Sequence, residues 1–327
     1  MKPALYGAVC KAATILAFLV ATSTASAQDA WPSRPIKLVV PFPPGGSSGA
    51  MALVLADELT KRLGQQVLVD NRGGAGGNIG AAFAAKQAPD GYTFFWGTGG
   101  THGVNPIIYK APGYDAVKDF IPVVLAMTAP NVIVVNPSFP AKTLGELIAM
   151  AKAEPGKFSS AAPGAGSTPH MMGELLKHRA GVQVVNVPYQ GSGPALADTI
   201  AGHVPIMFDG LPSSMPHIKS GKLRALAVSS ATRAQSDASI PTVAETLPGF
   251  DVTAWWAVFA PAKTPAPIVE RLNREVNAIL AAPATQRRIA DFGATTEGGT
   301  PERLQKLVAS EIERWSDLMK AQPVKVD

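Results

Sequence analysis

Short runs of apolar residues alternate along the chain with longer stretches in which apolar residues recur every three or four positions. The short runs predict buried β-strands, and the longer stretches predict amphipathic helices. In one such stretch, Leu55, Leu59 and Leu63 fall on one side of a helix. Strands are predicted over residues 36–42, 67–69, 92–96, 131–135, 158–161, 184–188, 205–208 and 223–228, and helices over residues 51–63, 79–87, 144–153, 171–178, 195–201, 268–280 and 302–320.

The order of these elements predicts an α/β protein with two lobes. Strands that alternate with helices form mostly parallel sheets whose faces the helices cover. A chain of 327 residues is long enough to bury two such cores. The chain is expected to cross between the lobes near residues 128–130 and again near residues 229–230. The first lobe then comprises residues 28–128 and 230–327, and the second comprises residues 129–229.

The start of the chain has the pattern of a secretory signal peptide, predicted over residues 1–27. Lys2 and Lys11 give it a basic start, and an apolar run follows them. Cleavage is predicted after Ala27, so the mature chain is expected to be exported. The only cysteine, Cys10, leaves with the signal, so neither a disulfide nor thiolate chemistry is expected in the mature protein.

Charge and motif content exclude several functional classes. The formal net charge of +5 is small and scattered, which argues against nucleic-acid binding. Neither G-x-x-x-x-G-K-[ST] nor G-x-G-x-x-G occurs, so no nucleotide cofactor is expected. The histidines lack metal-ligand spacing and no H-E-x-x-H motif occurs, so no metal site is expected. Beyond the signal, no apolar run is long enough to cross a membrane.

Five loops rich in glycine, serine and threonine follow strands or open helices. Each one alone is compatible with an ordinary turn. Ligands of open α/β sheets bind beyond the carboxyl ends of the strands, where helix N-termini present free N–H groups and partial positive charge. Five such loops together therefore predict a shared cleft for a carboxylate or phosphate. The loops lie at residues 43–48, 73–78, 97–105, 163–168 and 190–193.

Within the first loop, residues 45–49 spell G-x-S-x-G, the pattern of a hydrolase nucleophile elbow with Ser47 as the nucleophile. That role needs a base, an orienting acid and an oxyanion hole. No H-G-G-G-like loop precedes Ser47, and the motif follows the first strand of the mature chain rather than a later one. We therefore favour a binding protein that is not an enzyme, and we keep a secreted serine hydrolase using Ser47 as the alternative.

Two further features have alternative interpretations. His102 lies in a loop of glycines and threonines at a strand end, where it either lines the cleft or braces the loop. Trp255 and Trp256 are adjacent in a segment of strand character, so their side chains are expected on opposite faces. One tryptophan is expected in the core, and the other faces the cleft or the solvent.

A series of motifs spans almost the whole mature chain: PIKLVVPFPPGGSSG, GQQVLVDNRGGAGGNIGA, APDGYTFFWGT, NPIIY, YDAVKDFIPV, NVPYQGSGPALAD, LRALAVSS, IPTVAETLPGF, WWAVFAPAKTPAPIVERLN and a last helix around Trp315. In these motifs the chain resembles the Bug family, periplasmic solute receptors associated with tripartite tricarboxylate transporters. The resemblance implies the two-lobed periplasmic-binding-protein fold, type II-like, whose cleft closes on a small organic carboxylate. It implies delivery of that ligand to membrane transporter subunits, without a cofactor, and we expect a monomer. An orphan receptor that presents its ligand to a signalling partner is the alternative.

In this family one loop from each lobe grips a carboxylate, often with ordered water. By motif match these loops are Phe42–Ser48 and Pro163–Thr168 of this chain. Residues of other loops sit where the family lines its cleft. The candidate ligand-binding residues are Phe42, Gly45, Gly46, Ser47, Ser48, Asn78, Thr98, Thr101, His102, Pro163, Gly164, Gly166, Ser167, Thr168, Tyr189, Gln190 and Asp209.

The chain departs from the family pattern in the first loop. Gly49 stands where aspartate is usual, and Leu53 stands where arginine is usual. The G-x-S-x-G match depends on Gly49, so Ser47 and Ser48 are interpreted as hydroxyls that hold an anion beside the loop amides. Without the family's carboxylate, amides and hydroxyls alone set the local field. We hypothesise an aliphatic or aromatic organic acid without an ammonium group, unless both positions are purely structural.

Overall fold

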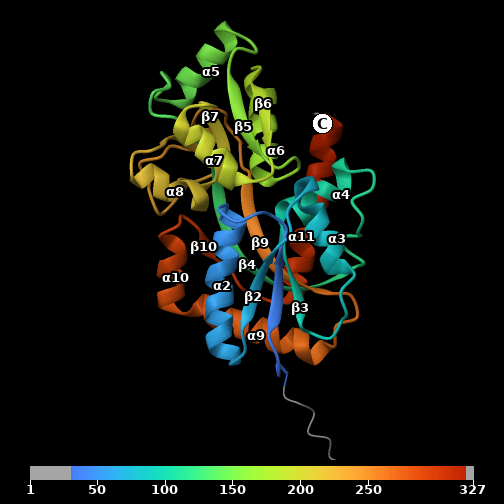
Figure 1. The fold of residues 1–327 in the computed structure, drawn as a ribbon. Coiled ribbons are helices and arrows are strands. Elements are labelled where there is room, and N and C mark those ends of the chain that lie inside the picture. The colour runs from blue at the N-terminus through green and yellow to red at the C-terminus, as the bar shows by residue number, and fades with distance from the viewer. Residues whose placement is uncertain (1–30, 322–327) are drawn as a thin grey trace, which may run out of the picture. The chain divides into compact units, whose positions relative to one another are not determined.

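The long strand β4 (Phe120–Val135) joins two groups of strands (Figure 1). The structure, a computed structural model, describes residues 31–321, and Arg34 begins one compact unit. The other strands are β1 (Ile36–Val40), β2 (Val67–Asn71), β3 (Thr93–Thr98), β5 (Ser159–Pro163), β6 (Val185–Tyr189), β7 (Ile206–Gly210), β8 (Arg224–Val228), β9 (Thr253–Pro261) and β10 (Thr295–Thr296).

The strand order is β2-β1-β3-β9-β4-β7-β5-β6, and β8 and β10 also pair with β4. The outer strands pair in parallel, β1 with β2 and β3, and β5 with β6 and β7. The central strands β4 and β9 pair antiparallel as far as Pro130 opposite Thr253, and from Asn131 onward β4 pairs with β7 and β8 instead. We call β1–β3, β9 and β10 with their helices the lower lobe, and β5–β8 with theirs the upper lobe (Figure 1).

Helices cover both lobes, and several begin directly after a glycine-rich loop at the end of a strand. In the upper lobe they are α5 (Leu144–Ala153), α6 (Thr168–Ala180), α7 (Ser192–Ala201), α8 (Leu211–Lys219) and the short η3 (Val243–Glu245). In the lower lobe they are α2 (Ser47–Leu63), η1 (Ala75–Gly77), α3 (Asn78–Ala85), η2 (Gly100–Val104), α4 (Asn105–Ile108), α9 (Ala266–Ala281), α10 (Pro283–Ala290) and α11 (Pro301–Ala321).

The second half of β4 supplies both faces of the upper-lobe core. Ile133 and Val135 pack on one face with residues of α5 and α6. Val132 and Val134 pack on the other face with residues of α7 and α8, which is the alternation expected of a strand. A separate cluster of buried residues around Phe259 fills the lower lobe.

The segment between β8 and β9 packs against strands and helices of the upper lobe. The expected crossing at residues 229–230 relied on the end of β8, but the segment that follows remains apolar. Ile240 is buried in the cluster that holds Val132 and Val134. Phe250 is buried in the cluster that holds Ile133, which also includes Val104 and Trp315 of the lower lobe. Only at Thr253 does the chain enter β9 and the lower lobe.

Prolines explain why one helix and part of one strand were not predicted from the sequence. The helix α8 contains Pro212 and Pro216 within nine residues, and β4 contains Pro122 and Pro130 before its predicted part begins at Asn131. Proline ordinarily interrupts helices and central strands, so neither α8 nor the part of β4 before Asn131 was predicted. The predicted signal peptide lies outside the described residues. Between residues 31 and 321, no helix is long and apolar enough to cross a membrane.

Candidate functional site

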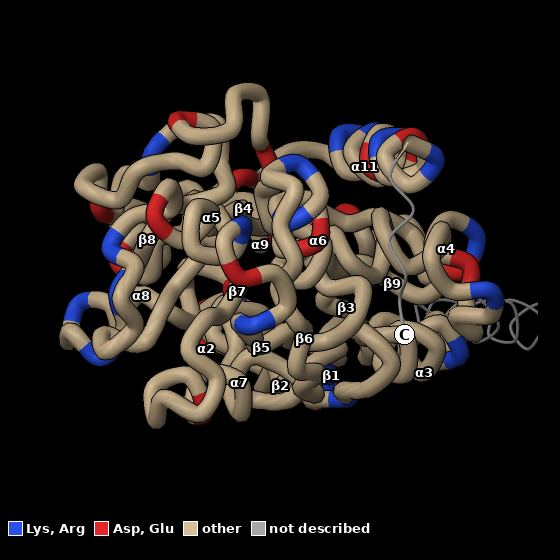
Figure 2. Tube along the Cα trace, turned by 90° about the horizontal axis from the view of Figure 1, so that it is seen from above, with Lys and Arg blue, Asp and Glu red and all other residues tan. Residues whose placement is uncertain are grey.

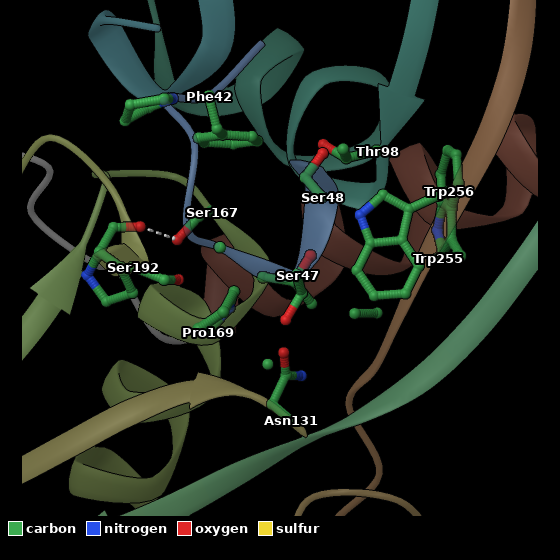
Figure 3. A pocket seen from close by; sticks show the side chains of 16 residues that line it. Phe42, Ser47, Ser48, Thr98, Asn131, Ser167, Pro169, Ser192, Trp255 and Trp256 are labelled. Carbon is green, nitrogen blue, oxygen red and sulfur yellow. Dashed lines mark hydrogen bonds between the residues drawn. The ribbon is translucent and has the colours of Figure 1, made fainter. Parts of the chain in front are cut away.

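A pocket between the lobes contains about 530 Å³ of space free of protein atoms, with the open solvent at its mouth included (Figure 3). Its walls come from the loop after β1, the loop after β5 and the first residues of several helices. Strand β9 adds two tryptophans, and β4 adds Asn131. The lining residues are Phe42, Pro43, Gly46, Ser47, Ser48, Thr98, Asn131, Pro163, Ser167, Thr168, Pro169, Ser192, Gly210, Ala254, Trp255 and Trp256.

Four helices begin at this pocket. The first residues of α2 and α7 line it, as do the N-cap residues of α6 and α8, Ser167 and Gly210. Each helix start presents N–H groups without helical partners and a partial positive charge. None of these lining residues carries a formal charge, whereas acidic and basic residues are interspersed along α11 and other outer elements (Figure 2). The pocket therefore suits an anion held by amides and hydroxyls.

Ser47 connects the two lobes by capping a helix of the opposite lobe. Its Oγ accepts a hydrogen bond from the Ser213 amide at 3.0 Å and lies 2.8 Å from Ser213 Oγ. Ser213 is the third residue of α8, whose N-cap residue Gly210 has no side chain with which to cap it. A Cβ on Gly210 would collide with Ser47 Oγ. Ser47 thus supplies from α2 the capping group that α8 itself lacks.

Behind this contact, the buried carboxylate of Asp209 organises three serines. Asp209 Oδ1 accepts from Ser192 Oγ at 2.6 Å, and Oδ2 accepts from Ser213 Oγ at 2.6 Å and Ser214 Oγ at 2.8 Å. Burial raises the pKa of the Asp209 carboxyl above its usual range, and the three hydroxyls oppose that shift. Asp209 does not line the pocket, but it fixes Ser192, which does, and Ser213, the partner of Ser47.

We expect Ser47→Ala to weaken binding of any ligand that the closed lobes hold, because the lobe-to-lobe cap is lost. A cap is worth about 1 kcal/mol, so the dissociation constant should rise about fivefold. Isothermal titration calorimetry measures the change. Thr143→Ala is the matched control, because Thr143 caps α5 within the upper lobe and away from the pocket. An unchanged affinity in Ser47→Ala would contradict the proposed role of the cap.

The structure brings about half of the predicted site residues to the pocket wall. Those that line it are Phe42, Gly46, Ser47, Ser48, Thr98, Pro163, Ser167 and Thr168. Those outside the lining are Gly45, Asn78, Thr101, His102, Gly164, Gly166, Tyr189, Gln190 and Asp209. Several of the latter hold the lining loops. Thr101 Oγ1, for example, accepts a hydrogen bond from the Thr98 amide at 3.0 Å.

His102 braces its loop from within the lower-lobe core. Its ring stacks on Phe259 with 3.9 Å between ring centroids, and its Nδ1 lies 3.0 Å from Thr101 Oγ1. Burial lowers the pKa of His102 to about 3, so the ring is neutral at ordinary pH. Of the two interpretations of His102, the structure therefore supports the bracing role.

Both Trp255 and Trp256 line the pocket, although only one was expected there at most. Trp255 also packs in the lower-lobe core. The partner strand β4 shifts register between Leu125 and Met127, beside the pairing of Met127 with Trp256. Such an irregularity increases the local twist of a strand pair, which relaxes the strict alternation of side chains that the sequence argument assumed.

Sequence reasoning missed several lining residues. Ser192 and Pro43 lie within predicted glycine-rich loops, so their position at a strand end was the available signal. Asn131 follows a proline and begins an apolar run. A polar residue at that point could have indicated a side chain that faces the pocket. The residues added by the structure are Pro43, Asn131, Pro169, Ser192, Gly210 and Ala254.

The two positions that depart from the family pattern lie outside the pocket lining. A Cβ on Gly49 would face Asn71 Nδ2 at 3.9 Å and Pro44 Cα at 4.0 Å, which are ordinary van der Waals contacts. Leu53 is 58% exposed on the outer face of α2. The hypothesis that this pair selects ligands without an ammonium group stays a prediction.

The lobes touch each other around the pocket, so the structure has a closed arrangement. A Cβ on Gly45 would lie 3.2 Å from Gly193 Cα, which shows how closely the two loop backbones approach. In a second contact between the lobes, Tyr109 Oη of the lower lobe donates to the Ala165 carbonyl oxygen of the upper lobe at 3.2 Å.

The sequence matches, over residues 51–324, a family model described as the tripartite tricarboxylate transporter family receptor. The chain belongs to this receptor family. Similar solved structures include an R. palustris protein with adipate, at 39% identity and a TM-score of 0.87 over 89% of this chain and 97% of that one. The periplasmic binding protein BugD is 35% identical, with a TM-score of 0.87 over 90% and 99% of the chains. MatC from Rhodopseudomonas palustris with bound malate is 35% identical, with a TM-score of 0.84 over 88% and 99%.

Family membership confirms the predicted Bug-type receptor, its two-lobed α/β fold and its place in the periplasm. The alternation of strands and helices predicted mostly parallel sheets. It did not predict that the central strands β4 and β9 pair antiparallel. The family and its solved members are binding proteins, which confirms that the protein is a receptor rather than a hydrolase. Among the described residues, no histidine hydrogen-bonds to Ser47, whose partner is Ser213.

Proposed function

We propose that this protein captures a small organic carboxylate in the interlobe pocket and delivers it to the membrane subunits of a tripartite tricarboxylate-type transporter. The observation that carries the proposal is the convergence of four helix N-termini on a pocket lined by hydroxyls and apolar groups without formal charge. Such a site stabilises an anion through fixed dipoles. The similar R. palustris proteins were solved with adipate and malate, which are both carboxylates.

In this proposal the Phe42–Ser48 loop and the Pro163–Thr168 loop hold the carboxylate from opposite lobes. The apolar part of the ligand packs against Trp255 and Trp256. The mature receptor begins after Ala27 and works as a monomer.

Capture and release then require the lobes to separate. The chain crosses between them where β4 changes partners, at Pro130 and Asn131, and again at Val252 and Thr253. In this proposal the upper lobe comprises residues 131–252, whereas the sequence suggested residues 129–229. A rotation about these two crossings opens the pocket and breaks the contact between Ser47 and Ser213.

A thermal-shift screen of the mature protein against carboxylic acids tests the proposal. A ligand at 100 times its dissociation constant should raise the free energy of unfolding by about 2.7 kcal/mol. The neutral amide of each acid is the matched control and should give no shift. Tryptophan fluorescence provides a second readout, because two tryptophans line the pocket. The proposal fails if no carboxylate stabilises the protein, or if ester hydrolysis is found that disappears in Ser47→Ala.

A further inference from the structure

Three buried polar atoms that line the pocket have no hydrogen-bond partner in the described protein. They are Ser48 Oγ, Asn131 Oδ1 and Trp255 Nε1. Each residue is more than nine-tenths buried. Buried polar groups in native proteins are almost always paired, and leaving one unpaired destabilises the folded state. A ligand that satisfies all three atoms is therefore the natural occupant of this pocket.

The orientation of the Asn131 amide is fixed by its neighbours. Asn131 Nδ2 donates to the Val252 carbonyl oxygen at 2.9 Å and lies 3.3 Å from Ser229 Oγ. Because the Val252 carbonyl can only accept, the nitrogen must face it and the oxygen must face the pocket. The free atom of Asn131 is therefore an acceptor, which needs a donor on the ligand.

The other two free groups are donors. The Trp255 indole N–H can only donate, and the Ser48 hydroxyl can donate from the second position of α2. Both suit the oxygens of a carboxylate. The pocket thus combines two donors with one acceptor, and a plain carboxylate satisfies only the donors.

We propose that the ligand is a hydroxycarboxylate, whose carboxylate accepts from Ser48 and Trp255 and whose hydroxyl donates to Asn131 Oδ1. The inference rests on the proposed function and names its ligand class. An ammonium group could also donate to Asn131, but none of the lining residues is acidic and four helix N-termini add positive potential. A neutral hydroxyl is therefore favoured over an ammonium group at the Asn131 end. Asn131 is also the residue at which β4 changes partners, so this hydroxyl contacts the junction of the lobes.

The test compares acids that differ at one carbon atom. Isothermal titration calorimetry is run with succinate, malate and aspartate, with propionate, lactate and alanine, and with adipate, 2-hydroxyadipate and 2-aminoadipate. In the set that binds best, the hydroxy acid should bind at least tenfold more tightly than both other members. Equal or tighter binding of the unsubstituted acid, or of the amino acid, overturns the inference while leaving carboxylate capture intact. No binding in any set, and no shift in the wider carboxylate screen, overturns the proposed function instead.

Variants assign the preference to the named atoms. In Asn131→Ala, the hydroxy acid and the unsubstituted acid should bind with about equal affinity. In Ser48→Ala, the affinity for every member of a set should fall by the same factor. Asn136→Ala is the matched control, because Asn136 is also a buried asparagine but donates to the Thr199 and Ile200 carbonyl oxygens away from the pocket. It should retain the preference. A preference that survives in Asn131→Ala overturns the assignment, and the wild-type comparison decides the ligand class even if that variant does not fold.

Discussion

Replacing Gly76 with alanine is expected to abolish tight ligand binding while the protein stays folded. Gly76 has a φ of +62°, and a Cβ there would collide with the Ala165 carbonyl oxygen and lie 2.9 Å from Tyr109 Oη. Gly76 and Tyr109 belong to the lower lobe and Ala165 to the upper lobe. The collision with Ala165 therefore exists only when the lobes are closed, whereas the contact with the end of the Tyr109 side chain lies within the lower lobe. We expect the dissociation constant to rise more than 100-fold, about 2.7 kcal/mol, as measured by calorimetric titration.

Gly181→Ala separates this collision from backbone strain. Gly181 has a φ of +64°, almost equal to that of Gly76, and a Cβ there would meet no atom within 4 Å. Both variants should lose about 1 kcal/mol of stability from the left-handed conformation of alanine. Only Gly76→Ala should lose affinity. Equal affinities in the two variants would show that ligand binding does not depend on this closed contact.

Asp209→Ala is expected to cause the largest loss of stability, about 3–5 kcal/mol, because it leaves buried serine hydroxyls without an acceptor. The hydroxyls of Ser192 and Ser214 donate only to Asp209 among the contacts of the described chain. Differential scanning calorimetry should show a fall in the melting temperature of about 10 °C. Asp198→Ala is the control, because Asp198 is an exposed carboxylate that also accepts two hydrogen bonds. Its loss of stability should be much smaller than that of Asp209→Ala, because solvent screens an exposed carboxylate.

The pH dependence of the same site tests the raised pKa of Asp209. A carboxyl group whose pKa is higher in the folded state binds its proton more readily there than in the unfolded chain. Its contribution to the free energy of unfolding is therefore full below the unfolded pKa and declines as pH rises toward the folded pKa. The free energy of unfolding of wild type minus that of Asp209→Asn should fall as pH rises from about 4. A difference that rises with pH would show that the fold favours the ionised carboxylate.

The sequence predicted those elements whose ends are set by neighbouring residues, such as capping residues, prolines and glycines. The predicted helix at residues 144–153 has these limits in the structure, because Thr143 caps its start and a proline and a glycine follow its end. The loops that start α2 and α6 were likewise predicted, since strand, glycine and serine stand together in the sequence.

The rest of the site depends on contacts between distant residues. Ser47 and Ser213 are 166 positions apart, and Ser213 lies on a helix that two prolines hid. Asn131 reaches the pocket because β4 changes partners there, and the only local sign of this in the sequence is a polar residue that follows a proline. His102 sits in a loop of the expected composition, yet the aromatic side chains of β9 and its neighbours hold it in the core. Sequence spacing identifies loops of a site more readily than it identifies the side chains that face the ligand.

The backbone contact between Gly45 and Gly193 has a consequence for the speed and cost of closing. Two loops that met through long side chains would have to freeze several rotamers each time the lobes came together, at up to about 2 kcal/mol for each long side chain. Glycine has no side-chain rotamers to lose, so at this contact the two loops meet through backbone atoms alone. The entropy of closing is then set mainly by the ligand and by the few hydroxyls that it orders, and the same surfaces can part again quickly when the ligand leaves.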